Sequence, residues 1–458
     1  MHTKTLLITL VTGLFLAADL SGETATAGAT TDEEILALRQ ALQTQQAVIN
    51  ELQGQMAMLR SQLDNMENTR AAGTGESSIE LPSTATSQSA SASVAKSSPD
   101  ISFEHKGWAF EIYGYIKLDA AYDTQRVFNG DFARYVMPRT SGDDNQLSIT
   151  ARQTRLGLKI QGPEWESWTP GGRIEVDFYG DYNSSTPLPR LRLAYAQMEN
   201  EEWLIRAGQD WDALSVVLPR TLNFATYANQ GALWSRRPQV KAQWNNTHEN
   251  GKLSITGAIA QAVSTDIDGG GQPDGSDSGV PNFEGAIAYT WNISDEWVLM
   301  TALSGQWGQV AIDQTSGTES VFDTYAGMFT ATLDWNKQIK LLGSVWYGTN
   351  LGSFNGGIGQ TINLTQDVPI RARGGWIQLQ TFPWSDLNWN IAFGIDDPLD
   401  SDLSTGMRSI NLNASTSIYY QLTSYLTLGI EYSYMQTGYM NQPDASNNRI
   451  QTSVIFEF

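Results

Sequence analysis

Basic side chains occur along one part of the chain at the two-residue spacing of a β-strand. In RLRLAYAQ, Arg190 and Arg192 alternate with Leu191, Leu193 and Tyr195, which places the two kinds of side chain on opposite faces. The same pattern singles out six further residues: Arg155, Lys159, Arg173, Arg206, Arg237 and Lys241. We predict that these side chains line a lumen as one basic wall, because guanidinium forks suit carboxylates.

The long connection 211–235 (WDALSVVLPRTLNFATYANQGALWS) carries a second set of charges. It is mildly apolar, and we expect it to fold into the space that the strands enclose and to form a constriction. Arg220 and the acidic pair Asp210 and Asp212 would then shape the electric field at the narrowest point. The alternative is a wall with little net effect, because luminal charges are hydrated and paired and the acidic residues at 175 and 177 would cancel their basic neighbours.

These residues need a scaffold of strands, and alternation continues through most of the chain. It predicts sixteen strands, near 109–122, 147–160, 172–181, 190–199, 203–210, 237–246, 252–263, 282–292, 296–308, 322–335, 338–349, 372–382, 387–396, 407–421, 424–437 and 447–458. Short links such as NTHENG and PWSD take turns with long polar ones, as in bacterial outer-membrane barrels. We therefore predict an all-β fold, a 16-stranded antiparallel transmembrane β-barrel over 103–458, which is wide enough for an aqueous lumen.

Aromatic residues gather at the expected short turns, as in the interfacial girdles of membrane barrels. They are Trp165, Trp168, Trp203, Trp297, Trp335, Trp384, Trp389 and Tyr425. The chain also ends in mid-strand (NRIQTSVIFEF), with Phe456 and Phe458 on the apolar face. We expect this strand to close the barrel against the first one. Its terminal aromatic resembles the C-terminal signal that outer-membrane barrels present to their assembly machinery.

Three segments precede the barrel. Residues 1–27 have a short basic start, an apolar run and an Ala-Thr-Ala stretch, which predicts a cleaved signal peptide, the run being too brief for a membrane anchor. Residues 31–68 predict an α-helical coiled coil, with a single packed amphipathic helix as the alternative. Its seam is Ile35, Leu38, Leu42, Gln45, Ile49, Leu52, Met56, Leu59, Leu63 and Met66. Residues 69–102 are a Ser/Ala-rich tract and predict a flexible linker.

Composition argues against several other classes of protein. The formal charge of −21 disfavours nucleic acid as a partner, and the absence of cysteine excludes disulfide scaffolds and thiolate sites. With three histidines and no phosphate-binding glycine motif, we expect no enzyme, no cofactor and no metal centre. The acidic, glycine-rich segment 264–281 holds Asp266, Asp268, Asp274 and Asp277, whose spacing fits no EF-hand. We interpret it as an exterior loop, with calcium binding as the open alternative.

The chain resembles the DcaP-like outer-membrane porins. The resemblance rests on the order of signal, coiled coil, linker and barrel and on FEIYGYIKLDAAYD, ARQTRLGLKI, IRAGQDWDALS, RRPQVKAQW and the terminal Phe. It covers essentially the whole chain, although other sixteen-stranded porins share versions of these motifs. The resemblance implies a homotrimer in outer-membrane lipid, a coiled coil in the periplasm, and uptake of dicarboxylic acids and other small anionic solutes.

Three functional hypotheses follow from these patterns. The first is a passive, anion-preferring diffusion porin, which the basic wall favours. The second is an envelope-organising structural protein that uses the barrel as an anchor and the coiled coil as a periplasmic or cell-wall contact. The third, a secreted glycan-binding β-protein, would leave the outward apolar faces exposed to water.

Overall fold

The computed structural model describes residues 101–139, 144–181, 187–267, 273–313 and 319–458. Strands make up most of these residues. The first ten are β1 (Ile101–His105), β2 (Trp108–Asp123), β3 (Gln146–Thr150), β4 (Arg155–Gln161), β5 (Thr169–Asp177), β6 (Arg190–Glu199), β7 (Trp203–Trp211), β8 (Arg236–His248), β9 (Gly251–Ala260) and β10 (Asn282–Asn292). The expected signal peptide, coiled coil and nearly all of the linker lie outside the described residues.

The rest of the chain continues the pattern and adds short helical turns. The remaining strands are β11 (Trp297–Asp313), β12 (Glu319–Trp335), β13 (Ile339–Thr349), β14 (Ile362–Asn363), β15 (Val368–Pro369), β16 (Arg371–Trp384), β17 (Leu387–Pro398), β18 (Arg408–Gln421), β19 (Leu426–Tyr439) and β20 (Gln442–Glu457). The helical turns are α3 (Asp274–Asp277), η1 (Gly352–Phe354), η2 (Gly357–Gly359) and η3 (Asp400–Asp402). Among the described residues, no helix is long and apolar enough to cross a membrane.

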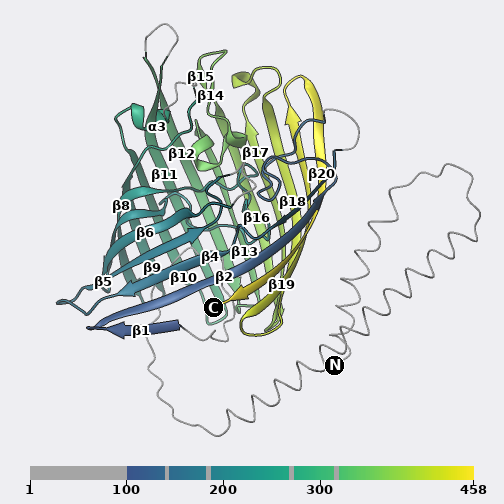
Figure 1. Ribbon diagram of the computed structural model, residues 1–458. Helices are drawn as coiled ribbons and strands as arrows, with labels where there is room; N and C mark the ends of the chain where they lie inside the picture. The colour runs from purple at the N-terminus through teal and green to yellow at the C-terminus, as the bar shows by residue number, and fades with distance from the viewer. Residues whose placement is uncertain (1–100, 140–143, 182–186, 268–272, 314–318) are drawn as a thin grey trace, which may run out of the picture. The chain divides into compact units, whose positions relative to one another are not determined.

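The strands close into one antiparallel barrel (Figure 1). The main sheet contains 18 strands, but β3 and β4 share one position beside β2, and β1 pairs with β2 alone. The wall is therefore a 16-stranded barrel, as the sequence predicts. Neighbouring strands of the wall follow one another in sequence, with two exceptions: the small β14–β15 hairpin lies between β13 and β16, and β2 meets β20 where the barrel closes.

The barrel closes between the first and the last strand of the wall. Residues 115–123 of β2 pair with 449–457 of β20, and Phe458 extends the pairing to Gly114. Strand β1, which the sequence analysis did not predict, pairs with the beginning of β2 through a turn at Lys106 and Gly107. It pairs with residues 108–112 of β2, just before residues 115–123, with which β20 pairs. Figure 1 shows β1 and the C-terminus at the same end of the barrel.

Side chains alternate between an apolar outer face and a polar inner face. In β20, Ile450, Val454 and Phe456 are exposed whereas the intervening positions 449, 451 and 453 are buried. The tryptophans of the expected girdle lie at short turns and are mostly exposed, Trp165 and Trp384 most of all. A lipid-facing surface of this kind is what a membrane barrel requires, and this confirms the transmembrane fold class.

Candidate functional site

The connection between β7 and β8, residues 212–235, lies inside the barrel. Its middle part is bound to the last strands and the first: Leu222 N–H donates to Glu431 of β19 at 2.7 Å, and the Leu222 carbonyl accepts from Lys117 of β2 at 2.9 Å. Further along, Gly231 O accepts the indole N–H of Trp346 of β13 at 2.8 Å, and Tyr227 O–H and Ser415 Oγ of β18 lie 2.8 Å apart. We call residues 212–235 the luminal loop.

Both ends of the luminal loop are held by one buried carboxylate. Asp212 accepts the backbone N–H of Ser215 at 2.7 Å and that of Ser235. Glu284 of β10 accepts the N–H of Ala213 at 2.7 Å and lies 3.8 Å from Arg237. Burial and the nearby charge of Glu284 raise the pKa of Asp212 to about 7. Asp212 therefore braces the loop and does not line the open space.

The expected basic residues lie on five strands that pair in sequence, β4 to β8. The register sets some of them directly beside one another, with Lys159 opposite Arg173 and Arg206 opposite Lys241. Like charges in neighbouring positions repel. Acidic side chains between them reduce this repulsion, so the wall contains both signs of charge.

Glu175 and Asp177 of β5 are the centre of this pairing. Glu175 lies within 2.7 Å of Arg192, 3.2 Å of Arg173 and 3.5 Å of Arg155. Asp177 lies 2.7 Å from Arg190 and 2.9 Å from Arg192. The alternative in which these two carboxylates offset their neighbours therefore holds for this part of the wall.

The other four basic residues also have acidic partners. Asp210 accepts from Arg206 at 3.1 Å and Lys241 at 2.6 Å, so this carboxylate is buried in an ion-pair network and does not face the open space. Lys159 pairs with Glu111 at 2.5 Å, where both side chains are substantially exposed. Arg237 is fully buried, and its guanidinium lies over the ring of Phe354.

A β-bulge in β6 corrects one part of the sequence analysis. Glu175 pairs with Leu193 but the next residue, Val176, pairs with Leu191, so Arg192 is an extra residue on its strand. The bulge reverses the alternation that follows it. Leu193 is buried, and Tyr195 lies under Arg206, so the expected outward face of Leu191, Leu193 and Tyr195 is wrong beyond Leu191.

A second irregularity accounts for Arg152, which strict alternation places on the lipid side. Residues 151–154 interrupt the wall between β3 and β4 with a turn closed by Thr154 N–H and Ala151 O. Arg152 is consequently buried, pairs with Asp131 at 2.5 Å and lies over the ring of Tyr179. The turn between β3 and β4 therefore places Arg152 inside the barrel.

A cavity of about 150 Å³ lies between the luminal loop and the inner face of the barrel. Strands β2, β4, β6 to β8 and β18 to β20 contribute to its walls. Its charged residues are Lys117, Arg155, Arg192, Arg220, Arg236 and Glu457. Five cationic side chains therefore face a single carboxylate.

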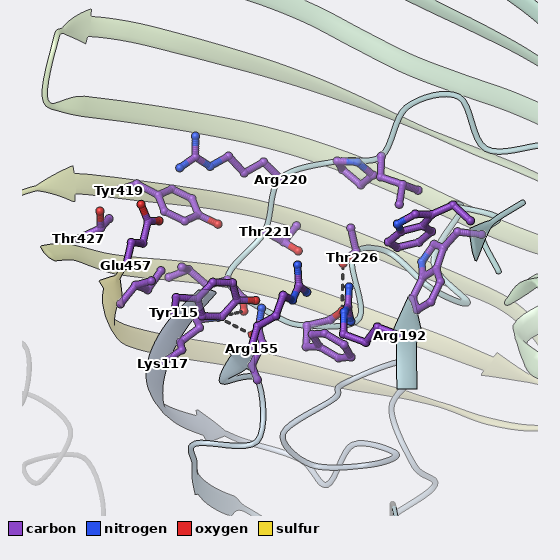
Figure 2. Close-up of a pocket in the computed structure, with 18 of the residues that line it drawn as sticks. Tyr115, Lys117, Arg155, Arg192, Arg220, Thr221, Thr226, Tyr419, Thr427 and Glu457 are labelled. Atoms are coloured by element: carbon purple, nitrogen blue, oxygen red, sulfur yellow. Dashed lines mark hydrogen bonds between the residues drawn. The ribbon is translucent and has the colours of Figure 1, made fainter. Parts of the chain in front are cut away.

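Aromatic rings hold the arginines of this cavity in place (Figure 2). Figure 2 shows Arg220 beside Tyr419 and Arg155 near Tyr115, with guanidinium to ring-centroid distances of 4.2 and 5.2 Å. Each contact of this kind contributes about 0.5–2 kcal/mol and restricts a long side chain. The charges therefore keep defined positions instead of moving freely in the lumen.

Arg236 is one of three charged cavity residues that were not predicted from the sequence, the others being Lys117 and Glu457. Alternation assigns it to the face opposite Arg237, but it is the first residue of β8, directly after the luminal loop. There it lies over Trp211 at 5.0 Å. Arg220, in contrast, was expected at the narrowest point and does line the cavity. Among the described residues, neither Arg220 nor Arg236 has a carboxylate within ion-pair distance; the guanidinium of each lies over an aromatic ring.

The acidic segment 264–281 is described only in part, and Asp268 lies outside the described residues. Asp274 begins the short α3 turn and accepts the N–H of Ile267 at 2.5 Å, so this carboxylate already has a backbone partner. Within the described part of the chain, no group of three His, Asp or Glu side chains is placed to hold a metal ion. The calcium alternative receives no support from these residues.

Comparison with solved structures identifies the kind of barrel. The chain is similar to the outer membrane channel DcaP of Acinetobacter baumannii, with a TM-score of 0.61 and 19% identity over 78% of this chain and 99% of that one. It is also similar to an anion-selective porin from Comamonas acidovorans, with a TM-score of 0.51 and 12% identity over 77% and 100%. Neither the protein-family models nor the curated proteins yield a match. The chain thus has the fold of a DcaP-like outer-membrane porin.

Proposed function

We propose that the protein is an outer-membrane porin for the passive diffusion of small hydrophilic solutes, with a preference for anions such as dicarboxylic acids. One observation carries the preference: five cationic side chains and one carboxylate line the cavity beside the luminal loop. A site with such an excess lowers the energy of an anion and raises that of a cation. The Comamonas neighbour, an anion-selective porin, supports the same reading.

The paired wall contributes less to this preference than the cavity does. Arg155, Arg173, Arg190 and Arg192 share two carboxylates, Glu175 and Asp177, so much of their field is compensated close by. Arg220 and Arg236 have no such partner among the described residues. The selectivity therefore depends chiefly on these two side chains, and the luminal loop acts as the constriction by holding Arg220 in the lumen.

The same proposal includes the assembly expected from the sequence. It is a homotrimer in the outer membrane, with the coiled coil of 31–68 in the periplasm. Phe456 and Phe458 serve as the signal to the barrel assembly machinery, which is consistent with their place at the end of the strand that closes the barrel on β2. The trimer and the periplasmic location of the coiled coil are implied by the resemblance, whereas the coiled coil itself is predicted from the heptad seam of 31–68.

The decisive experiment measures reversal potential in planar bilayers under a potassium chloride gradient. The wild type and the double variant Arg220→Gln, Arg236→Gln are compared with Arg373→Gln, whose side chain is 66% exposed and paired with Asp397. We expect anion selectivity in the wild type and in the control, and a permeability ratio several-fold closer to one in the double variant. A correctly folded barrel without conductance would instead favour the structural anchor.

A further inference from the structure

The guanidinium of Arg236 is held in place without a counter-ion. It lies between two indole rings, 5.0 Å from the centroid of Trp211 and 5.7 Å from that of Trp234. Its Nε and Nη1 atoms are buried and have no hydrogen-bond partner among the described residues. A buried cation in such surroundings is costly unless an anion compensates it. The arrangement therefore favours binding of an anion from solution.

The surroundings of Arg236 add to this excess instead of removing it. The charges of Arg192, Arg190 and Arg155 lie close enough to oppose its own, and the charge of Asp177 offsets them only in part. Counting the cavity residues together with their ion-pair partners, the cations are Lys117, Arg155, Arg173, Arg190, Arg192, Arg220 and Arg236, and the carboxylates are Asp119, Glu175, Asp177 and Glu457. Seven positive charges thus face four negative ones, and a bound anion with more than one charge restores the balance best.

The cavity has room for a small anion. Its volume is about 150 Å³, which is ample for such a solute together with water molecules. The cations enter from different strands and from the luminal loop, so they surround a common space. A tetrahedral oxyanion carries its charge on several oxygens within one small group and suits donors that converge from several sides.

We propose that this cavity is a saturable binding site for a compact dianionic oxyanion, with inorganic phosphate and small phosphate monoesters as the ligand class. The proposal rests on the proposed porin function, to which it adds a defined site in the lumen. Arg236 supplies the uncompensated charge from the barrel wall, and Arg220 supplies it from the luminal loop. The hydroxyl group of Thr427 lines the same cavity and can donate to a further oxygen, whereas those of Thr221 and Thr226 already donate to the carbonyl groups of Asn223 and Phe224.

The test measures how inorganic phosphate, added at millimolar concentration, reduces the chloride current through single channels in planar bilayers. We expect a reduction that saturates, with an apparent affinity about tenfold weaker in Arg236→Gln and Arg220→Gln, as when a charge-assisted contact is lost. Arg373→Gln, at the exposed end of β16, should match the wild type. Heat-modifiable migration of each variant verifies that its barrel is folded.

Two further comparisons separate this site from general anion preference. Arg236→Lys keeps the charge but loses the planar fork, so chloride selectivity should persist while phosphate binding weakens several-fold. Phosphate should also bind more tightly at about pH 8 than at about pH 6, because it gains its second charge in this range, whereas sulfate, a dianion at both, should not change. Three outcomes would overturn the proposal: a reduction of the chloride current by acetate as large as that by phosphate, a reduction by phosphate that is linear in concentration, or one that is unaltered in Arg236→Gln. Absence of conductance in the correctly folded wild type would instead contradict the porin function itself.

Discussion

Gly114 and Phe458 close the barrel through two main-chain hydrogen bonds. Gly114 N–H donates to Phe458 O at 3.0 Å, and Phe458 N–H donates to Gly114 O at 3.1 Å. A Cβ added to Gly114 would overlap the carbonyl oxygen of Arg155 on the adjoining strand and lie 3.2 Å from the Phe458 ring. Glycine at this position therefore allows three strands of the wall to meet at the seam.

This seam predicts that Gly114→Ala destabilises the barrel. Because the added methyl group meets backbone that cannot move freely, we expect a loss of about 1–3 kcal/mol in the free energy of unfolding. Urea unfolding in detergent, followed by heat-modifiable migration, measures it. Gly257→Ala is the matched control, since a Cβ there has nothing within 4 Å, and equal effects of the two substitutions would contradict the explanation.

The contact between Trp346 and the luminal loop predicts a change in channel behaviour. Trp346→Phe removes the N–H that Gly231 O accepts at 2.8 Å and leaves a buried carbonyl group, at a cost of about 1 kcal/mol or more. The loop should become more mobile, which single-channel recording detects as increased open-channel noise. Trp389→Phe loses an indole hydrogen bond of the same length on the exposed outer face, to Thr416, and should leave the noise unchanged.

Asp212 predicts a pH dependence of stability with a definite sign. Its pKa is raised to about 7 by burial and by Glu284, whereas an aspartate of the unfolded chain titrates near about 3.9. Between about pH 4 and about pH 7 the folded protein holds a proton that the unfolded chain has released. The contribution of this group to stability is therefore full below about pH 4 and decreases up to about pH 7.

Asp212→Asn should remove that slope, because the neutral amide keeps an oxygen for the N–H groups of Ser215 and Ser235. Urea unfolding of wild type and variant at several pH values gives the difference. Asp402→Asn serves as a control of opposite sign: hydrogen bonding to Arg371 lowers the pKa of Asp402, so its contribution is lost only as the pH falls below about 4. A wild-type and Asp212→Asn difference that does not vary with pH would contradict the assignment.

The Glu175 cluster predicts opposite effects for its two kinds of member. Arg192→Gln leaves Glu175 and Asp177 with fewer partners and should shift the reversal potential towards cations. Glu175→Gln leaves Arg155, Arg173 and Arg192 without their shared carboxylate and should shift it towards anions. Because each side chain is nearly fully buried, each change should also cost about 3 kcal/mol or more in stability. Shifts of the same sign in both variants would contradict a paired wall.

The sequence by itself determined the wall of this protein. Residues such as Ile450, Val454 and Phe456 alternate with polar neighbours, and the period of two follows from the geometry of each strand alone. The alternation of short and long connections likewise predicts an even, antiparallel barrel. The mildly apolar character of the connection 211–235 also led us to expect Arg220 in the lumen, and this residue lines the cavity beside the luminal loop.

Only the tertiary structure decided how the charges inside are compensated. Arg192 and Arg152 occur at a bulge and at a broken strand, and one extra residue reverses the faces of all that follow. Glu175 contacts three arginines from three strands, whereas Arg236 forms an ion pair with none of the described acidic groups. In the sequence alone, a paired arginine and an unpaired one cannot be told apart. Ion pairing depends on distances of a few ångströms between strands far apart in sequence, so local periodicity predicts which side chains face the lumen but not which of them keep a free charge.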